Sequence, residues 1–331
     1  MVGLFSKGKG SSRAGLFIYG GVMQYIELAP ARGKDVSYRV EQCVELPYDR
    51  GDDGGEIFTN YNITESNLKT LKKKIGRKWA ANVCAGIQSK DVLIRTCELG
   101  NMSLDDLRAS FRYEFDKFFP IPVNEAVYDL AFIERPRAEG GGDFSKTVSC
   151  IASAVRGSLV ENLMTAAQSV GINLSAIEPA PVSMLRCLMG PGVTSEFNIY
   201  ALAGVVSSII VAAYKDNGIV YRNTSQSFAA EDSTGRTIDA FTRDMQATIT
   251  FAATQIRDFT PGRVYIGGYG AHQGAAIQNH IASVMPTPVE IVDPWESWGI
   301  TGAPEERFGW EVAIGLAMRP ERGTAANAGA V

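Results

Sequence analysis

The 331-residue sequence has little of what metal sites, disulfide scaffolds and nucleic-acid surfaces require. Its two histidines, His272 and His280, have no Cys or carboxylate at ligand spacing, so we expect no metal site. The five cysteines are an odd number and form no C-x-x-C pair, which is typical of a protein from a reducing compartment. The formal net charge of -4 argues against nucleic acid as the main partner, because phosphate binding needs clustered Lys and Arg.

Long hydrophobic runs are also missing. The longest, near Ile209–Tyr214, is far shorter than the roughly 20 residues that a membrane-spanning helix needs. The apolar start Met1–Phe5 is too short for a signal peptide, and basic residues follow it. We therefore expect a cytoplasmic protein that meets a membrane only through its surface or through a partner.

Motifs of common enzymes are absent as well. There is no G-x-x-x-x-G-K-[ST] loop for nucleotide phosphate and no G-x-S-x-G elbow for a serine nucleophile. The stretch Gly268–Gly274 follows a predicted strand and opens a helix, with Asp293 further on, as in some dinucleotide sites. Its glycine spacing is off by one residue and too little chain follows for a full cofactor domain, so a dinucleotide-dependent enzyme is a minor alternative.

The clearest positive feature is a strand–strand–strand–helix unit that the sequence contains twice. Hydrophobic patterning predicts its strands at Ala14–Tyr19, Val22–Ala29 and Val36–Leu46, and again at Phe197–Ala203, Ser207–Tyr214 and Gly218–Arg222. A basic helix follows the first copy, and a long amphipathic helix from about Thr237 follows the second. Two such halves resemble the actin, Hsp70 and sugar-kinase superfamily, which implies an α/β, two-lobed, actin-like (ribonuclease-H-like duplicated) fold.

The nucleotide-binding acids of that superfamily are missing from both copies. In its members the turn between the first two strands of each half holds phosphate, and an acidic residue precedes the turn. The corresponding residues here are Phe17 and Ala201, which have no lone pair to hold magnesium-bound water or to act as a base. We therefore expect no catalytic residue, no hydrolysis and no cofactor, with binding of ATP and Mg²⁺ as the alternative.

If nucleotide does bind, the resemblance assigns glycines to it. A Gly-Gly turn in the second lobe of actin-like proteins passes under the adenosine, where a side chain would collide with it. The candidate residues are Gly20 and Gly21 in the first turn and Gly267, Gly268 and Gly270 in the second lobe.

Between the two copies, residues 83–180 predict a separate α+β subdomain. We expect its strands and its second helix at Val92–Glu98, Ala126–Ile133, Thr147–Val155 and Ser158–Val170. Its first helix has Ser103 as N-cap and runs toward Pro120. The apolar stripe of that helix consists of Leu104, Leu107, Phe111, Phe115 and Phe118.

These segments together resemble PilM, the FtsA-like cytoplasmic actin-like component of type IV pilus assembly, from about Leu4 to Arg319. The resemblance depends on the order of short strings such as Phe118-Phe119-Pro120-Ile121-Pro122 and Ala176-Ile177-Glu178-Pro179. We expect a first lobe at residues 14–82 and 181–195 and a second lobe at 196–319 with a reduced upper subdomain. Flexible segments at 1–13 and 320–331 flank these lobes.

The resemblance implies a partner as well as a fold. Members of that family bind the cytoplasmic tail of the inner-membrane protein PilN, in a groove between the first lobe and the inserted subdomain, and recruit assembly motors. The resemblance implies a scaffold and pseudo-ATPase, peripheral at the inner membrane, with Phe118, Phe119 and Ile121 as candidate partner contacts. Alternatively, the aromatic residues of this segment fill the subdomain core, which is the simpler interpretation of Phe115 and Phe118.

Two other functions stay open. The first is an ATP-binding switch of the same pilus platform. The second is a GspL-like cytoplasmic module of a type II secretion platform, although that protein continues into a membrane helix.

The basic helix after the first copy, with Thr64 as its expected N-cap, carries Lys69, Lys72, Lys73 and Lys74. A solvated helix face is the simpler interpretation of these lysines. The sharper one is attraction to an anionic membrane surface, at about 1 kcal/mol for each basic residue close to it.

Overall fold

The computed structural model describes residues 12–31, 37–51, 57–136, 147–190, 192, 195–228 and 235–320. The predicted flexible ends lie outside the described residues, apart from residues 12, 13 and 320, and so does the glycine-rich stretch 140–142. The chain divides into two compact units. Unit 1 contains residues 1–87, 164–192 and 293–331, and unit 2 contains residues 88–163 and 193–292.

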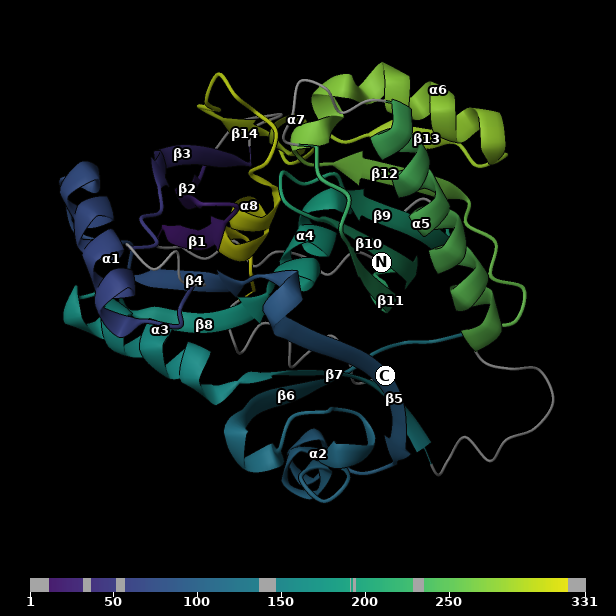
Figure 1. Cartoon of the computed structure of the whole chain (residues 1–331), viewed down its shortest axis with the longest axis horizontal. Coiled ribbons are helices and arrows are strands. Elements are labelled where there is room, and N and C mark those ends of the chain that lie inside the picture. Colours follow the sequence, from purple (N-terminus) through teal and green to yellow (C-terminus); the bar gives the residue numbers. More distant parts are fainter. Residues whose placement is uncertain are drawn as a thin grey trace. The chain divides into compact units, whose positions relative to one another are not determined.

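Unit 1 is built on a six-stranded sheet in the order β14-β3-β2-β1-β4-β8 (Figure 1). Its strands are β1 Arg13–Tyr19, β2 Val22–Pro30, β3 Tyr38–Pro47, β4 Asn82–Ile87, β8 Leu174–Pro179 and β14 Ile300–Thr301. The first three form an antiparallel meander, whereas β4 pairs parallel to β1 and β8 parallel to β4. The helices in this part of the chain are α1 Tyr61–Ile75, α3 Gly157–Ser169, α4 Ala180–Leu188, α7 Pro294–Ser297 and α8 Glu311–Ala317.

Unit 2 repeats this strand order in a five-stranded sheet, β11-β10-β9-β12-β13. Its strands are β9 Phe197–Leu202, β10 Ser208–Tyr214, β11 Asn217–Thr224, β12 Arg263–Gly267 and β13 Val289–Ile291. Helices α5 Gly235–Gln255 and α6 Gly274–Val284 pack on it. When the strands are numbered in chain order within each sheet, both sheets contain the order 3-2-1-4-5, with the same directions of pairing. The predicted duplication is therefore confirmed.

The inserted subdomain is smaller than the predicted 83–180. It is a three-stranded sheet, β5-β7-β6, formed by Val92–Gly100, Thr147–Arg156 and Ala126–Phe132. The predicted boundaries were wrong because β4 and β8 belong to the sheet of unit 1. Strand β4 is a short run buried throughout its length after Asn82, so it shows no alternation that would identify a strand. Within unit 2, Thr96 of β5 donates a hydrogen bond to the carbonyl of Ile219 in β11 at 3.1 Å.

Helix α2 (Leu104–Phe111) begins as predicted, because the Ser103 hydroxyl accepts a hydrogen bond from the backbone N–H of Asp106. It ends earlier than predicted, at Phe111, and a 3₁₀ turn at Phe115–Lys117 replaces the expected last turns. The apolar stripe nevertheless packs on one core, since Leu107, Phe111 and Phe115 are all buried.

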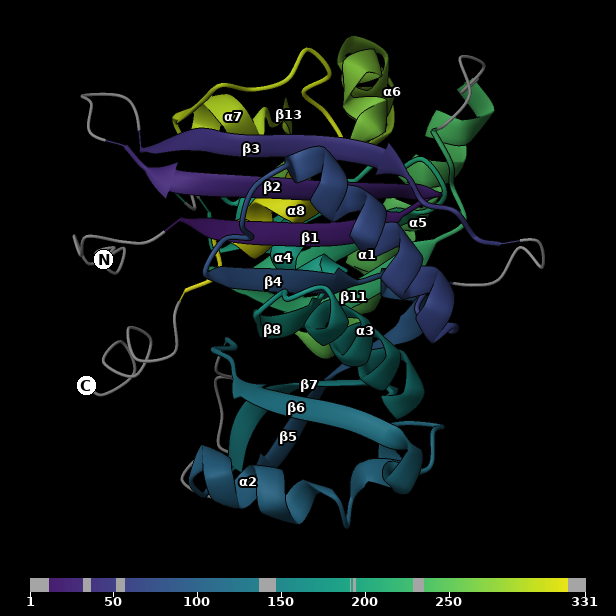
Figure 2. The ribbon, with the colours of Figure 1, turned by 90° about the vertical axis from the view of Figure 1, so that its left-hand side faces the viewer.

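The N-cap of α1 is Asn60 and not Thr64, as was expected. The Asn60 side chain accepts from the backbone N–H groups of Asn62 and Ile63, as N-cap asparagines do. Thr64 lies inside the helix, fully buried, and donates its hydroxyl to the carbonyl of Asn60. Helix α1 lies across one face of the unit 1 sheet (Figure 2).

Helix α8 lies against the other face of that sheet and beside α4 (Figures 1 and 2). It joins unit 1 although residues 196–319 were expected in the second lobe. A Cβ atom on Gly15 of β1 would overlap the carbonyl oxygen of Ala313, and one on Gly315 would overlap that of Ser183 in α4. Two glycines thus allow α8 to contact the backbones of β1 and α4 directly.

Replacing Gly315 by alanine is expected to lower the free energy of unfolding by about 3 kcal/mol, because the added methyl group meets a backbone that cannot move aside. This loss is expected even though alanine favours a helix by about 1 kcal/mol over glycine. Urea denaturation measures it. The matched control is Gly235→Ala in α5, where a Cβ atom meets nothing within 4 Å. Equal stabilities of the two variants would contradict the packing described for α8.

Candidate functional site

The first candidate phosphate turn is a tight hairpin between β1 and β2. Tyr19 pairs with Val22, so Gly20 and Gly21 alone form the loop, with φ values of 63° and 86°. Positive φ at both positions is the geometry of a type I′ turn, which favours glycine in any protein. The carbonyl of Gly21 accepts a hydrogen bond of 2.7 Å from the backbone N–H of Tyr48. Backbone geometry therefore accounts for both glycines without a nucleotide.

Phe17 occupies the position at which actin-like proteins carry an acidic residue. It lies on the face of β1 that α8 covers. It lies opposite Gly86 of β4, and a Cβ atom on Gly86 would come within 2.8 Å of the Phe17 ring and 2.9 Å of Leu316. The ring is 5% exposed. A carboxylate at this position would be surrounded by apolar groups, so the apolar residue suits its surroundings.

In the second copy, Ala201 was predicted to occupy the position of the acidic residue, which was wrong by one residue. Gly267 of β12 pairs with Leu202, as Gly86 pairs with Phe17, so Leu202 is the counterpart of Phe17. Ala201 faces the core under α5 and α6 instead, because neighbouring strand residues point to opposite faces. Leu202 is also apolar and buried, so neither copy places a carboxylate before its turn.

The turn between β9 and β10 is closed by the segment that follows β11. Phe228 donates its backbone N–H to the carbonyl of Gly204 at 2.9 Å, and the Ser227 hydroxyl donates to the carbonyl of Val205 at 2.6 Å. The Ser208 hydroxyl donates to the carbonyl of Gln226 and accepts from the backbone N–H of Gly204. Two of these groups, the Gly204 N–H and the Ser208 hydroxyl, are of the kind that wraps phosphate in an actin-like protein. Both are bonded here to the chain itself.

The three glycines of the second lobe lie against this same turn. The backbone N–H of Ala203 donates to the carbonyl of Gly267, and that of Gly270 donates to the carbonyl of Ala203, both at 2.9 Å. Gly268 has a φ of 91°, and a Cβ atom on it would lie 2.7 Å from the Ala203 oxygen. A Cβ atom on Gly270 would lie 2.7 Å from the ring of Phe228. Gly268 and Gly270 are thus required by close packing within unit 2.

Sequence reasoning missed the role of Phe228. This aromatic residue is fully buried and packs edge-on against Phe241 of α5 at 5.4 Å between ring centroids. It stands in the polar run Ser225-Gln226-Ser227, and a lone large apolar side chain in such a run was the signal that it anchors the segment. Residues 225–234 are all that separate β11 from α5.

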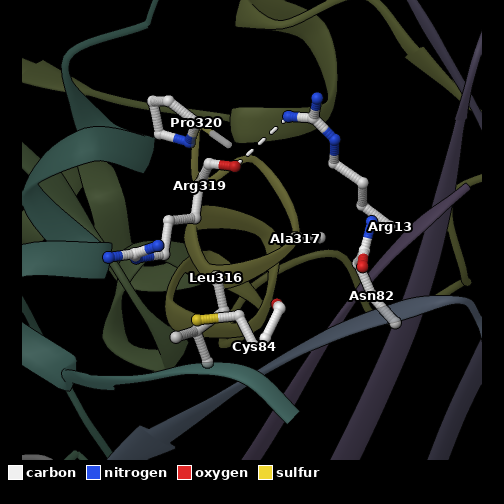
Figure 3. A pocket seen from close by; sticks show the side chains of 9 residues that line it. Arg13, Asn82, Cys84, Leu316, Ala317, Arg319 and Pro320 are labelled. Carbon is white, nitrogen blue, oxygen red and sulfur yellow. Dashed lines mark hydrogen bonds between the residues drawn. The ribbon is translucent and has the colours of Figure 1, made fainter. Parts of the chain in front are cut away.

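Unit 1 contains a cavity of about 290 Å³ that the sequence did not indicate (Figure 3). Its lining residues are Arg13, Ala14, Asn82, Cys84, Ser175, Leu316, Ala317, Arg319 and Pro320. Arg13 donates a hydrogen bond to the carbonyl of Arg319 at 3.2 Å, whereas the side chain of Arg319 points away from Arg13 (Figure 3).

The chemistry of this cavity is inert. Burial, and then the Glu178 carboxylate, raise the pKa of the Cys84 thiol to about 12, so the thiol is protonated at neutral pH. Glu178 is held by Arg186 and lies 3.6 Å from Arg319. Across the part of the chain that is described, no cluster of His, Cys, Asp and Glu is arranged to hold a metal ion.

The candidate partner contacts in the inserted subdomain divide into buried and accessible residues. Phe119 is 3% exposed and packs against Phe115 with ring centroids 5.0 Å apart, so it belongs to the core and not to the surface. Phe118 is partly exposed and stacks on Phe111 at 5.5 Å. Ile121 is partly exposed. Phe118 and Ile121 therefore stay available to a partner, whereas Phe119 is buried in the core of the subdomain.

No helix among the described residues combines the length and the apolar character needed to cross a membrane.

A scan against protein-family models finds no match, and a search of curated proteins finds no relative. Solved structures do match. The chain is similar to a chain of a PilM-PilN type IV pilus biogenesis complex, with a TM-score of 0.73 and 18% identity over 94% of this chain and 99% of the other. It is also similar to a Bacteroides thetaiotaomicron protein with an actin-like ATPase fold, with a TM-score of 0.52 and 10% identity over 94% and 97% of the two chains. The cytoplasmic domain of EpsL from the type II secretion system of Vibrio cholerae has a TM-score of 0.48 and 8% identity, over 93% and 94% of the chains.

These similarities show the fold. The expected two-lobed actin-like architecture is confirmed, and so is its resemblance to PilM at the level of fold.

The contact between Gly270 and Phe228 can be tested by a double-mutant cycle. Gly270→Ala is expected to cost about 2 kcal/mol of unfolding free energy, because its methyl group overlaps the Phe228 ring. In a Phe228→Ala background this added cost is expected to fall by about 1 kcal/mol, since the ring is gone. Urea denaturation of the four proteins gives the coupling.

The control background is Phe259→Ala, another large-to-small change of a buried ring in unit 2, which packs on Phe197. There the cost of Gly270→Ala is expected to be unchanged. Additive costs in both backgrounds would show that Phe228 does not occupy the space above Gly270.

Proposed function

We propose that this chain is a cytoplasmic adaptor of a type IV pilus inner-membrane assembly platform, one that binds the tail of a PilN-like membrane protein and does not hydrolyse ATP. The observation that carries the proposal is the similarity of fold over 94% of the chain to a structure of a PilM-PilN complex. As a scaffold of this kind, it would sit at the inner membrane through its partners and connect them to the assembly motors.

The loss of ATPase activity is supported by the two turns. Phe17 and Leu202 replace the acids that hydrolysis requires to position magnesium and water. In the second turn, the backbone N–H groups of Ala203, Gly204 and Gly270 already have acceptors within the protein. A phosphate would have to displace these internal hydrogen bonds, and a buried N–H group left without an acceptor costs about 1–3 kcal/mol.

Calorimetric titration of the full chain with Mg-ATP is expected to show no binding at micromolar concentrations. A nucleotide-binding actin-like protein measured in the same buffer serves as the positive control. Micromolar affinity would contradict the pseudo-ATPase proposal and favour an ATP-binding switch. In that case Gly270→Ala, which adds a methyl group beside the second turn, is expected to weaken binding.

The partner contact is proposed at the Pro120–Pro122 segment of the inserted subdomain. Both prolines are exposed and lack a backbone N–H, so this segment offers apolar contacts and carbonyl acceptors to a peptide. Ile121 lies between them, and the packed rings of Phe115 and Phe119 hold the segment in place from the core side. A rigid apolar contact loses little entropy on binding, which favours recognition of a short tail.

Replacing Ile121 by Asp is expected to weaken binding of a PilN-like tail peptide by at least about tenfold, because an unpaired charge replaces a buried apolar contact. Fluorescence anisotropy with a labelled peptide measures the affinity. The matched control is Val127→Asp on β6, which is 45% exposed and belongs to the same subdomain. The peptide surface is misplaced if Ile121→Asp binds like the wild type while both variants keep the wild-type melting temperature.

A further inference from the structure

Positive charge in this chain is concentrated at the C-terminal end of α1. The stretch from residue 69 to residue 78 contains six basic residues and no Asp or Glu. Without these six, the 26 other Lys and Arg would face 36 Asp and Glu, and the formal net charge would be -10 instead of -4. All six side chains are exposed; they are Lys69, Lys72, Lys73, Lys74, Arg77 and Lys78. We call this set the basic end of α1.

Half of the basic end of α1 is used by the protein itself. Lys69 pairs with Glu65 at 2.7 Å, and Arg77 pairs with Glu27 at 2.8 Å. The ammonium group of Lys72 donates to the carbonyl of Val170, at the end of α3, at 2.7 Å. The other half is Lys73, Lys74 and Lys78, for which no carboxylate partner occurs among the described residues.

The helix holds these charges in a fixed position. Leu68, Leu71 and Ile75 are buried under α1, so the opposite side of the helix must face outward (Figure 2). Gly76 ends the helix in the left-handed conformation, with its N–H bonded to the carbonyl of Lys72. The helix dipole explains a preference for cations at Lys72–Lys74, but Arg77 and Lys78 extend the charge beyond the helix.

We propose that the basic end of α1 binds the anionic surface of a phospholipid bilayer. A bilayer meets one side of a protein only, so it can contact this cluster while the acidic remainder of the chain stays away from it. A nucleic acid suits the cluster less well, because Trp79, the aromatic residue that follows the cluster in the sequence, packs against Tyr25 and donates its N–H to Val170, and so is not free to stack on a base.

The expected contact is electrostatic and reversible. The apolar side of α1 is already buried in unit 1, so the helix has no apolar face to insert between lipids. Attraction of this kind weakens when salt is added, since the screening length is only about 10 Å at 0.1 M ionic strength. The proposal goes beyond the adaptor function and does not depend on the identity of the protein partner.

Co-sedimentation of the full chain with vesicles tests the proposal. The wild type is expected to bind phosphatidylcholine vesicles that contain phosphatidylglycerol, and not pure phosphatidylcholine vesicles. Replacing Lys73, Lys74 and Lys78 together by Glu is expected to lower the partition coefficient by on the order of a hundredfold. The matched control replaces Lys117, Arg236 and Arg257 by Glu, which changes the net charge equally at exposed sites of unit 2. This control is expected to keep most of the binding.

The proposal would be overturned if the wild type did not bind anionic vesicles at low salt, or bound neutral vesicles equally well. It would also be overturned if the two triple variants lost binding equally, or if single-stranded RNA bound more tightly than vesicles under the same conditions. Binding that survives high salt would contradict its electrostatic basis. Melting temperatures and affinity for the tail peptide are expected to be unchanged in the Lys73, Lys74 and Lys78 variant. Failure of lipid binding is therefore distinguishable from failure of the adaptor function.

Discussion

Direct contact between backbones at glycine positions is the constraint on which both units depend. In unit 1, Gly15 and Gly315 let α8 touch the backbones of β1 and α4. In unit 2, Gly268 and Gly270 bring the chain after β12 against Ala203, the residue after β9. A single methyl group at any of these places would have to displace a backbone or a buried ring, and interiors packed like crystals have no room for that. The middle of β1 in unit 1 and the end of β9 in unit 2 are therefore in tight contact with the chain itself.

This packing is the structural basis of the proposed loss of nucleotide chemistry. A phosphate site needs open backbone N–H groups and space above them. In the second turn the segment containing Phe228 lies against the turn and donates to its carbonyls. The backbone N–H groups of Ala203, Gly204 and Gly270 donate to Gly267, Ser208 and Ala203. In the first turn the two glycines are explained by the type I′ hairpin. Phe17, three residues before that turn, places an aromatic ring on the face of β1 that α8 covers. An actin-like fold can thus keep its strand order while its turns are filled from within.

The sequence was sufficient for the features that local chemistry determines. Alternating strands and glycine turns predicted the duplicated sheets, and Ser103 with Asp106 predicted the start of α2. It was insufficient where the partner of a segment decides the outcome. The residues of β4 are buried throughout after Asn82, so their pattern does not distinguish a strand from other buried elements. The choice between Ala201 and Leu202 is a one-residue difference in register, which only the pairing with β12 resolves. Likewise, Phe119 and Ile121 have similar hydrophobicity, but only one of them lies in the core.

The position of α8 has a consequence for how the protein is made. This helix is synthesised after every described strand of both units, yet it covers β1, the first of these strands in the chain. Until α8 arrives, the apolar face of β1 that carries Phe17 lacks its cover, and an uncovered strand face is where nascent chains aggregate. Arg13 then joins the two distant segments through its hydrogen bond to the carbonyl of Arg319. During synthesis, β1 therefore waits for its cover until the described strands of both units have been made.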